Sequence, residues 1–142
     1  MSYEILGLAY SRIGDFLIDR FQNQDARIFL YAEAEPGVMG EGVYLDRGVD
    51  ILYIDYDSDL TDLLFEAWEA EVPDKRWSSM EFFIRKKRFS ATFTYVKFKE
   101  FDPEREAGAL RRAFGDKPIF YPGPSFEERY EALDPKNFPG DF

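Results

Sequence analysis

One stretch of the sequence decides the fold: DYDSDLTDLLFEAWEAEVPDKRWSSMEFFIRKKRFSATFTY, residues 55–95. Its first half predicts an amphipathic helix, because apolar residues recur at the spacing of a single helical face. We expect Asp57 or Ser58 to cap this helix, and residues 72–74, which include a proline, to end it. The apolar face is formed by Leu60, Leu63, Leu64, Ala67 and Trp68.

After Trp77 the hydrophobic period changes to two, which predicts a β-hairpin. The run RKKR, residues 85–88, is expected to form its turn. Alternating side chains predict one buried and one solvent-facing side, with the buried side packed under the preceding helix. The expected buried side consists of Met80, Phe82, Ile84, Phe89, Ala91, Phe93 and Tyr95.

The rest of the chain supplies two further helices and three strands. Gly7 and Gly14 fall inside the first helix, where glycine is unfavourable, and we interpret them as positions of close packing. The three prolines of residues 118–124 predict irregular structure. We expect helices over 3–21 and 103–114, the second capped by Asp102, and an antiparallel meander of strands over 27–35, 43–45 and 49–56.

These elements predict an α+β fold with the order α-β-β-β-α-β-β-α. We expect a five-stranded antiparallel sheet with the helices gathered on one face. A length of 142 residues fits one domain, which we assign to residues 1–124. Residues 125–142 are expected to form a helical turn, capped by Ser125, and a C-terminal arm.

Histidine and cysteine are both absent from the composition. Their absence removes the commonest general base, every Ser-His-Asp or Cys-His arrangement, thiolate metal sites and disulfides. We find no positive sequence argument for catalysis and expect no cofactor. The N-terminus lacks the pattern of a signal peptide and no apolar run is long enough for a membrane span, so we expect a cytoplasmic protein without membrane contact.

The net charge of −10 is concentrated in the first half of the chain. Residues 1–71 carry 16 acidic and 4 basic side chains, whereas residues 72–142 carry 12 acidic and 14 basic ones. Such a negative field disfavours direct binding of nucleic acid, because that affinity depends on neutralising phosphates. It favours steered association with a basic protein partner.

Acidic residues recur along the helix of the deciding stretch at spacings of three and four, which places them on one helical face. One interpretation is an ordinary solvated face; the other is a strip that meets a basic partner. The helix has almost no lysine or arginine, so we expect the strip to repel itself, which favours a function. The candidate partner-binding residues are Asp55, Asp57, Asp59, Asp62, Glu66 and Glu69.

The spacing of Asp55, Asp57, Asp59 and Glu66 is superficially similar to that of a calcium-binding EF-hand loop. The sixth position should be glycine, but Leu60 stands there and begins the apolar helical face. We therefore favour a strand end followed by helix-capping acids, and predict no metal site.

The basic run 85–88 has two interpretations as well. It is either a nucleic-acid patch, with Phe83 and Tyr95 as stacking groups, or the charged tip of a hairpin. Its position between two alternating strands favours the hairpin tip.

Several segments resemble the YezG-like immunity proteins. The likeness covers residues 3–122 and includes the segment YAEAE of the first strand, WSSMEF and KRFSATFTY of the hairpin, and RAFG followed by Pro118. Members of that family are cytoplasmic antitoxins paired with secreted polymorphic toxins, often nucleases. The matching hairpin residues are Trp77, Ser78, Phe82, Phe89, Phe93 and Tyr95.

The resemblance implies a non-catalytic immunity protein that binds and neutralises a cognate toxin. An acidic surface could occupy the basic cleft of a nuclease as a mimic of phosphate. Two other classes stay open on the residues alone. One is a small carboxylate-based or metal-dependent enzyme, and the other is an acidic secretion chaperone or adaptor module.

Overall fold

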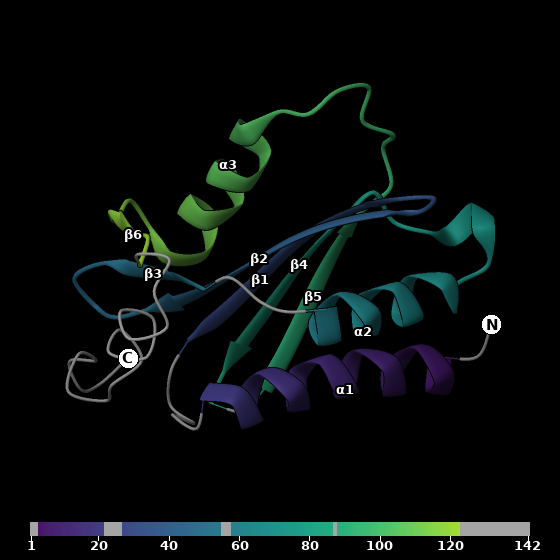
Figure 1. Ribbon diagram of the computed structural model, residues 1–142, viewed down its shortest axis with the longest axis horizontal. Coiled ribbons are helices and arrows are strands. Elements are labelled where there is room, and N and C mark those ends of the chain that lie inside the picture. The colour runs from purple at the N-terminus through teal and green to yellow at the C-terminus, as the bar shows by residue number, and fades with distance from the viewer. Residues whose placement is uncertain (1–2, 22–26, 55–57, 87, 123–142) are drawn as a thin grey trace.

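Six strands form a single sheet in the computed structural model, which describes residues 3–21, 27–54, 58–86 and 88–122 (Figure 1). Three α-helices pack against this sheet, so the predicted α+β class is confirmed. The strands lie in the order β5-β4-β1-β2-β3-β6. Their bounds are Ile28–Glu35 (β1), Val38–Asp46 (β2), Ile51–Ile54 (β3), Ser79–Arg85 (β4), Arg88–Thr94 (β5) and Ile119–Phe120 (β6). The helices are Tyr3–Phe21 (α1), Ser58–Glu69 (α2) and Pro103–Phe114 (α3), with a short 3₁₀ turn at Pro73–Lys75.

The predicted meander and hairpin are both present. Strands β1, β2 and β3 pair antiparallel in sequence, and the β4–β5 hairpin joins them through β4, which pairs with β1. The second strand is longer than expected because Gly40 and Gly42 belong to the ladder, opposite Glu33 and Tyr31. The turn before it is confined to the residues around Gly37, whose φ of 77° suits glycine.

The helices lie on both faces of the sheet, so the expectation that one face holds them all is wrong. Alternate residues of β1 point to opposite faces. Ile28 and Leu30 belong to the core under α1 and α2, whereas Phe29 belongs to the core with Leu110 and Phe114 of α3. Figure 1 shows α3 on one side of the sheet and the other two helices on the opposite side. The physical reason lies in β1, whose first five residues are all buried and therefore need cover on both faces.

Strand β6 is an addition to the expected sheet. It pairs parallel to β3 through Ile51 and Ile119, so the sheet is mixed and not purely antiparallel. Pro118 does not prevent this pairing, since it lies just before the strand and its carbonyl accepts from the Ile51 amide at 2.9 Å. Lys117 adds an ion pair with the buried carboxylate of Asp46 at 2.8 Å. The expectation of irregular structure over this proline-rich segment is therefore wrong at its first residues.

Helix α1 covers the hairpin, where the sequence led us to expect α2. The indole N–H of Trp77, at the base of β4, donates to the Tyr10 hydroxyl of α1 at 2.8 Å. The Tyr10 ring also packs against Phe93 of β5, with 5.3 Å between ring centroids. Helix α2 contributes Trp68, whose indole N–H donates to the Trp77 carbonyl at 2.8 Å. The two tryptophans thus join both helices to the hairpin.

Strand β5 forms an outer edge of the sheet, and this position exposes residues expected to be buried. Met80, Phe82 and Ile84 of β4 are buried as predicted. On β5, Phe89 is 37% exposed and Ala91 is exposed, and Tyr95 just beyond the strand is 55% exposed. An edge strand has a neighbour on one side only, so alternation alone overestimates its burial.

In the described part of the chain, none of the helices has the length and apolarity needed to cross a membrane. The expected helical turn and arm at 125–142 lie outside the described residues.

Candidate functional site

The acidic strip lies on the solvent side of α2. Asp59, Asp62, Glu66 and Glu69 are all exposed, at spacings of three and four residues along the helix. The opposite side of α2 is buried through Leu60, Leu64, Ala67 and Trp68, which confirms the predicted apolar face. Asp55 and Asp57, the other two predicted partner-binding residues, lie outside the described residues.

Two arginines of α1 reach part of the acidic strip. Arg12 pairs with Glu66 at 2.9 Å, and Arg20 approaches Asp59 at 3.5 Å. The expectation that the strip repels itself without compensation is therefore wrong for these two carboxylates. The sequence of α2 alone could not predict these ion pairs, because both arginines belong to α1.

Asp62 and Glu69 differ from their neighbours on the strip. Among the described residues neither side chain forms an ion pair, and both are exposed. They are separated by seven residues, which is about two helical turns or roughly 10 Å along the axis. Of the four strip carboxylates that the structure describes, these two are the most available to an incoming cation.

From Ser58 onward, the segment with the calcium-loop spacing is helical. Helix α2 begins at Ser58, so Asp59 lies in its first turn, and Leu60 is fully buried in the core. An acid in the first turn is instead favourable to the helix dipole. Within the residues that the structure describes, no cluster of three or more His, Cys, Asp or Glu side chains is placed to hold a metal ion.

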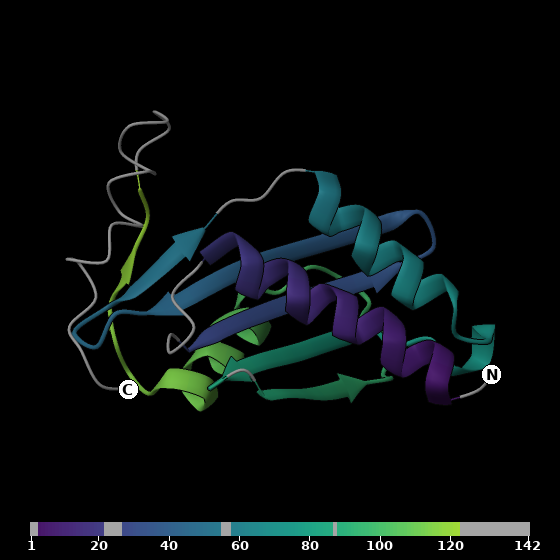
Figure 2. The same ribbon diagram turned by 90° about the horizontal axis from the view of Figure 1, so that it is seen from below.

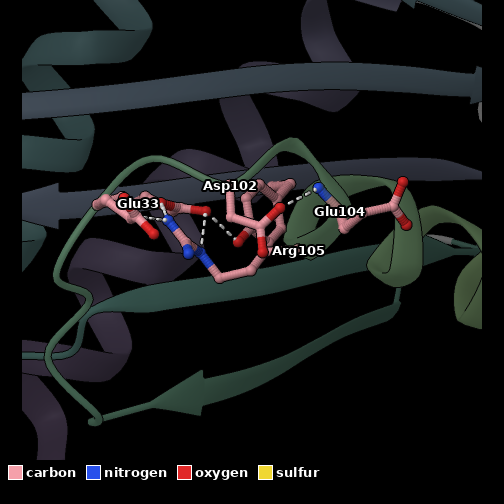
Figure 3. A network of polar contacts seen from close by, with 6 residues as sticks. Glu33, Asp102, Glu104 and Arg105 are labelled. Atoms are coloured by element: carbon pink, nitrogen blue, oxygen red, sulfur yellow. Dashed lines mark hydrogen bonds and ion pairs between the residues drawn. The ribbon is translucent and has the colours of Figure 1, made fainter.

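A second polar cluster, which the sequence did not reveal, lies on the α3 side of the sheet (Figure 3). The Arg105 guanidinium donates to both carboxylate oxygens of Glu33, at 3.1 and 3.0 Å, and Tyr31 donates to the same carboxylate at 2.5 Å. Arg105 also lies over the ring of Phe98, 3.9 Å from its centroid. No local pattern links residues 33 and 105, which are far apart in the chain, so only the fold brings them together.

This cluster attaches the first turns of α3 to the sheet. Asp102 caps the helix as predicted, accepting from the Glu104 amide at 3.0 Å. Glu106, one turn further on, accepts from the Tyr44 hydroxyl of β2 at 2.6 Å. Burial raises the pKa of both Tyr31 and Tyr44, and their carboxylate acceptors raise it further, so both phenols stay protonated donors at neutral pH. The tyrosines, Arg105 and the carboxylates of this cluster bind one another, which is the arrangement of a structural joint.

The predicted basic turn is confirmed as the tip of the β4–β5 hairpin. Arg85 ends β4 and Arg88 begins β5, and the two residues lie directly opposite each other. Lys86 has a φ of 51°, a left-handed conformation that is unusual for a residue with a side chain. The hairpin residues that carry the resemblance are divided: Trp77, Ser78 and Phe82 are buried, whereas Phe89 and Tyr95 are exposed.

No protein-family model matches the chain, and no curated protein matches it.

Proposed function

We propose that this protein is a non-catalytic immunity protein, which binds a cognate toxin and neutralises it. One observation carries the proposal: Asp62 and Glu69 project from α2 in line with Asp59 and Glu66 and, within the described residues, have no cationic partner. Asp62 and Glu69 lie four and three residues from Glu66, and like charges at this spacing destabilise a helix, so we infer a partner that these carboxylates meet.

The expected partner surface is basic. A nuclease toxin fits this requirement best, because its cleft holds arginines and lysines for the phosphates of its substrate. Two carboxylates about two helical turns apart would enter such a cleft as a pair of negative charges. The attraction would speed the encounter and weaken as salt is added.

The ion pairs with Arg12 and Arg20 determine which carboxylates of the strip are left for a partner. They hold Glu66 and Asp59 toward α1, at 2.9 and 3.5 Å, and leave Asp62 and Glu69 for the partner. Both pairs are exposed, so each contributes only about 0–1 kcal/mol to stability and can rearrange on binding.

The test combines a charge-reversal variant with a matched control. We expect Asp62→Lys/Glu69→Lys to bind the toxin about tenfold or more weakly, because attraction becomes repulsion at the contact. Glu100→Lys/Asp116→Lys changes the net charge equally at exposed sites outside α2 and should bind as the unchanged protein does.

Protection is measured by co-expressing each protein with candidate toxins from its own genome and counting surviving cells. The unchanged protein and the control variant should protect, and the α2 variant should not. Equal protection by both variants would place the toxin contact elsewhere, and failure of the unchanged protein against every toxin would overturn the immunity function.

A further inference from the structure

The outer edge of β5 is open. Strand β5 pairs with β4 on one side, and no described residue pairs with it on the other. In an antiparallel ladder alternate N–H and C=O groups of an edge strand point outward without a partner. Residues 88–92 are all exposed, and Figure 2 shows β5 along one long side of the molecule.

Apart from Arg88 at its first position, this edge lacks the features by which natural edge strands avoid further pairing. Its register with β4 runs one to one from Arg85↔Arg88 to Ser79↔Thr94, so no bulge twists it away. Residues 89–96, FSATFTYV, contain neither proline nor a charged residue. Alternating aromatic and β-branched residues instead favour a strand. The edge is therefore a template for an added strand.

Cations flank the edge at both ends. Arg85, Lys86 and Arg88 are exposed before it, and Lys97 and Lys99 are exposed beyond it. The sequence has no acidic residue between positions 85 and 99. In a chain with a net charge of −10, this stretch is a local basic surface.

The cations at the hairpin tip surround a hollow of about 590 Å³, which Phe83, Phe89 and Ser90 also line. Arg85 and Arg88 lie directly opposite each other across the strands, an arrangement that is unfavourable for like charges. Glu81 is the acidic residue of β4, and Arg112 donates to its carboxylate at 3.3 Å.

Among the described residues neither Arg85, Lys86 nor Arg88 forms an ion pair. Guanidinium groups placed together in this way are suited to a carboxylate, which they bind through paired hydrogen bonds.

We propose that the outer edge of β5 binds an extended acidic segment of a partner protein as an additional strand. The hairpin hollow takes one of the segment's carboxylates, and Lys97 and Lys99 face acidic residues at its other end. The basic residues around this edge favour an acidic segment of another protein over a second copy of the chain. Antiparallel pairing of two β5 strands about Ala91 would place Arg88 of each copy opposite Thr94 of the other, and the basic hairpin tip of one copy beside Lys97 of the other.

This surface is separate from the acidic strip. Helix α1 lies between α2 and β5 (Figure 2), so the two surfaces face different directions and carry opposite charge. The proposal therefore stands or falls without the toxin contact on α2.

The experiment titrates the full-length protein with a fluorescent peptide of sequence EEVTVTVEE and follows its anisotropy. Two matched peptides serve as controls: one with lysine in place of every glutamate, and one with proline in place of the central valine, which removes a backbone donor. We expect the acidic peptide alone to bind, and hydrogen exchange of the β5 amides to slow in its presence.

Two variants test the cations. Arg85→Gln/Arg88→Gln should weaken binding by about tenfold or more, because the carboxylate loses its paired hydrogen bonds. Lys97→Gln/Lys99→Gln, which lies outside the strands, should weaken it to a smaller extent and keeps the test valid if the first variant fails to fold.

Failure of the acidic peptide to bind would overturn the proposal, as would equal binding of the lysine or proline peptide. Sedimentation showing a dimer whose β5 amides are already protected would assign the edge to a second copy instead.

Discussion

At the scale of single residues, Glu71 is unusual because its carboxylate is buried without a cationic partner among the described residues. It follows α2 and is only 6% exposed, near the hydroxyls of Tyr10 and Tyr95. Among the described residues its carboxylate has no ion pair. Burial raises the pKa of Glu71 above its ordinary value of 4.5. The ionised form of this group is therefore less favourable in the folded protein than in the unfolded chain.

The raised pKa of Glu71 makes the folding stability fall as the pH rises. The unfolded chain releases the Glu71 proton near pH 4.5, and the folded protein releases it at a higher pH. Between these values the folded state binds more protons, so stability falls as pH rises through the folded pKa. We expect Glu71→Gln to unfold at a higher urea concentration than the unchanged protein at pH 7, with a difference that shrinks toward pH 4.5.

Glu69→Gln serves as the matched control, since it removes a carboxylate at an exposed position near the end of the same helix. A Glu71→Gln variant that is less stable at pH 7, or one whose gain does not vary with pH, would contradict the assignment.

At the scale of elements, the two glycines of α1 have different surroundings, although the sequence assigned close packing to both. A methyl group on Gly7 would meet nothing within 4 Å. One on Gly14 would lie 2.4 Å from the tip of the Phe89 ring, so here the helix approaches β5 closely.

We therefore expect Gly7→Ala to raise the free energy of unfolding by about 0.5–1 kcal/mol, the usual helix preference. Gly14→Ala should lower it, since overpacking costs about 1–3 kcal/mol and exceeds that preference. Urea unfolding measures both. In a Phe89→Ala background Gly14→Ala should become stabilising. Equal gains from both substitutions in the unchanged background would show that α1 does not press on β5.

The sequence predicted individual helices and strands better than it predicted their arrangement. Apolar periodicity located α1, α2, α3 and the hairpin because a helix or strand is encoded by neighbouring residues. It did not predict that α3 crosses to the other face, or that β6 joins β3, because both depend on contacts between distant segments. The exposure of Phe89 was missed for a related reason: alternation gives the side of a strand and not its place in the sheet.

For the candidate site, the sequence located the acidic residues of α2 but not their partners. The spacing placed Asp59, Asp62, Glu66 and Glu69 on one exposed face, as the structure has them. Arg12 and Arg20 reach that face from α1, and the joint between Glu33 and Arg105 links β1 to α3. Helix packing and sheet topology decide such pairs, and neither is encoded locally.

At the scale of the whole molecule, charge is arranged as two opposed surfaces. The acidic strip lies on the solvent side of α2, and the basic surface follows the β5 edge, with α1 between them (Figure 2). Each surface is suited to a partner of the opposite sign, so the net charge of −10 describes the chain less well than this separation does.

The proposed function rests on the claim that the acidic strip binds a basic protein. The most direct measurement is a pull-down from the native cell lysate, with the tagged protein and its Asp62→Lys/Glu69→Lys variant as baits. It is made at about 0.1 M and about 1 M salt, where the Debye length is about 10 Å and about 3 Å. We predict one large partner with a basic domain, retained by the unchanged protein at low salt, released at high salt and absent with the variant. A partner held equally by both baits, or no partner at either salt concentration, would contradict the claim.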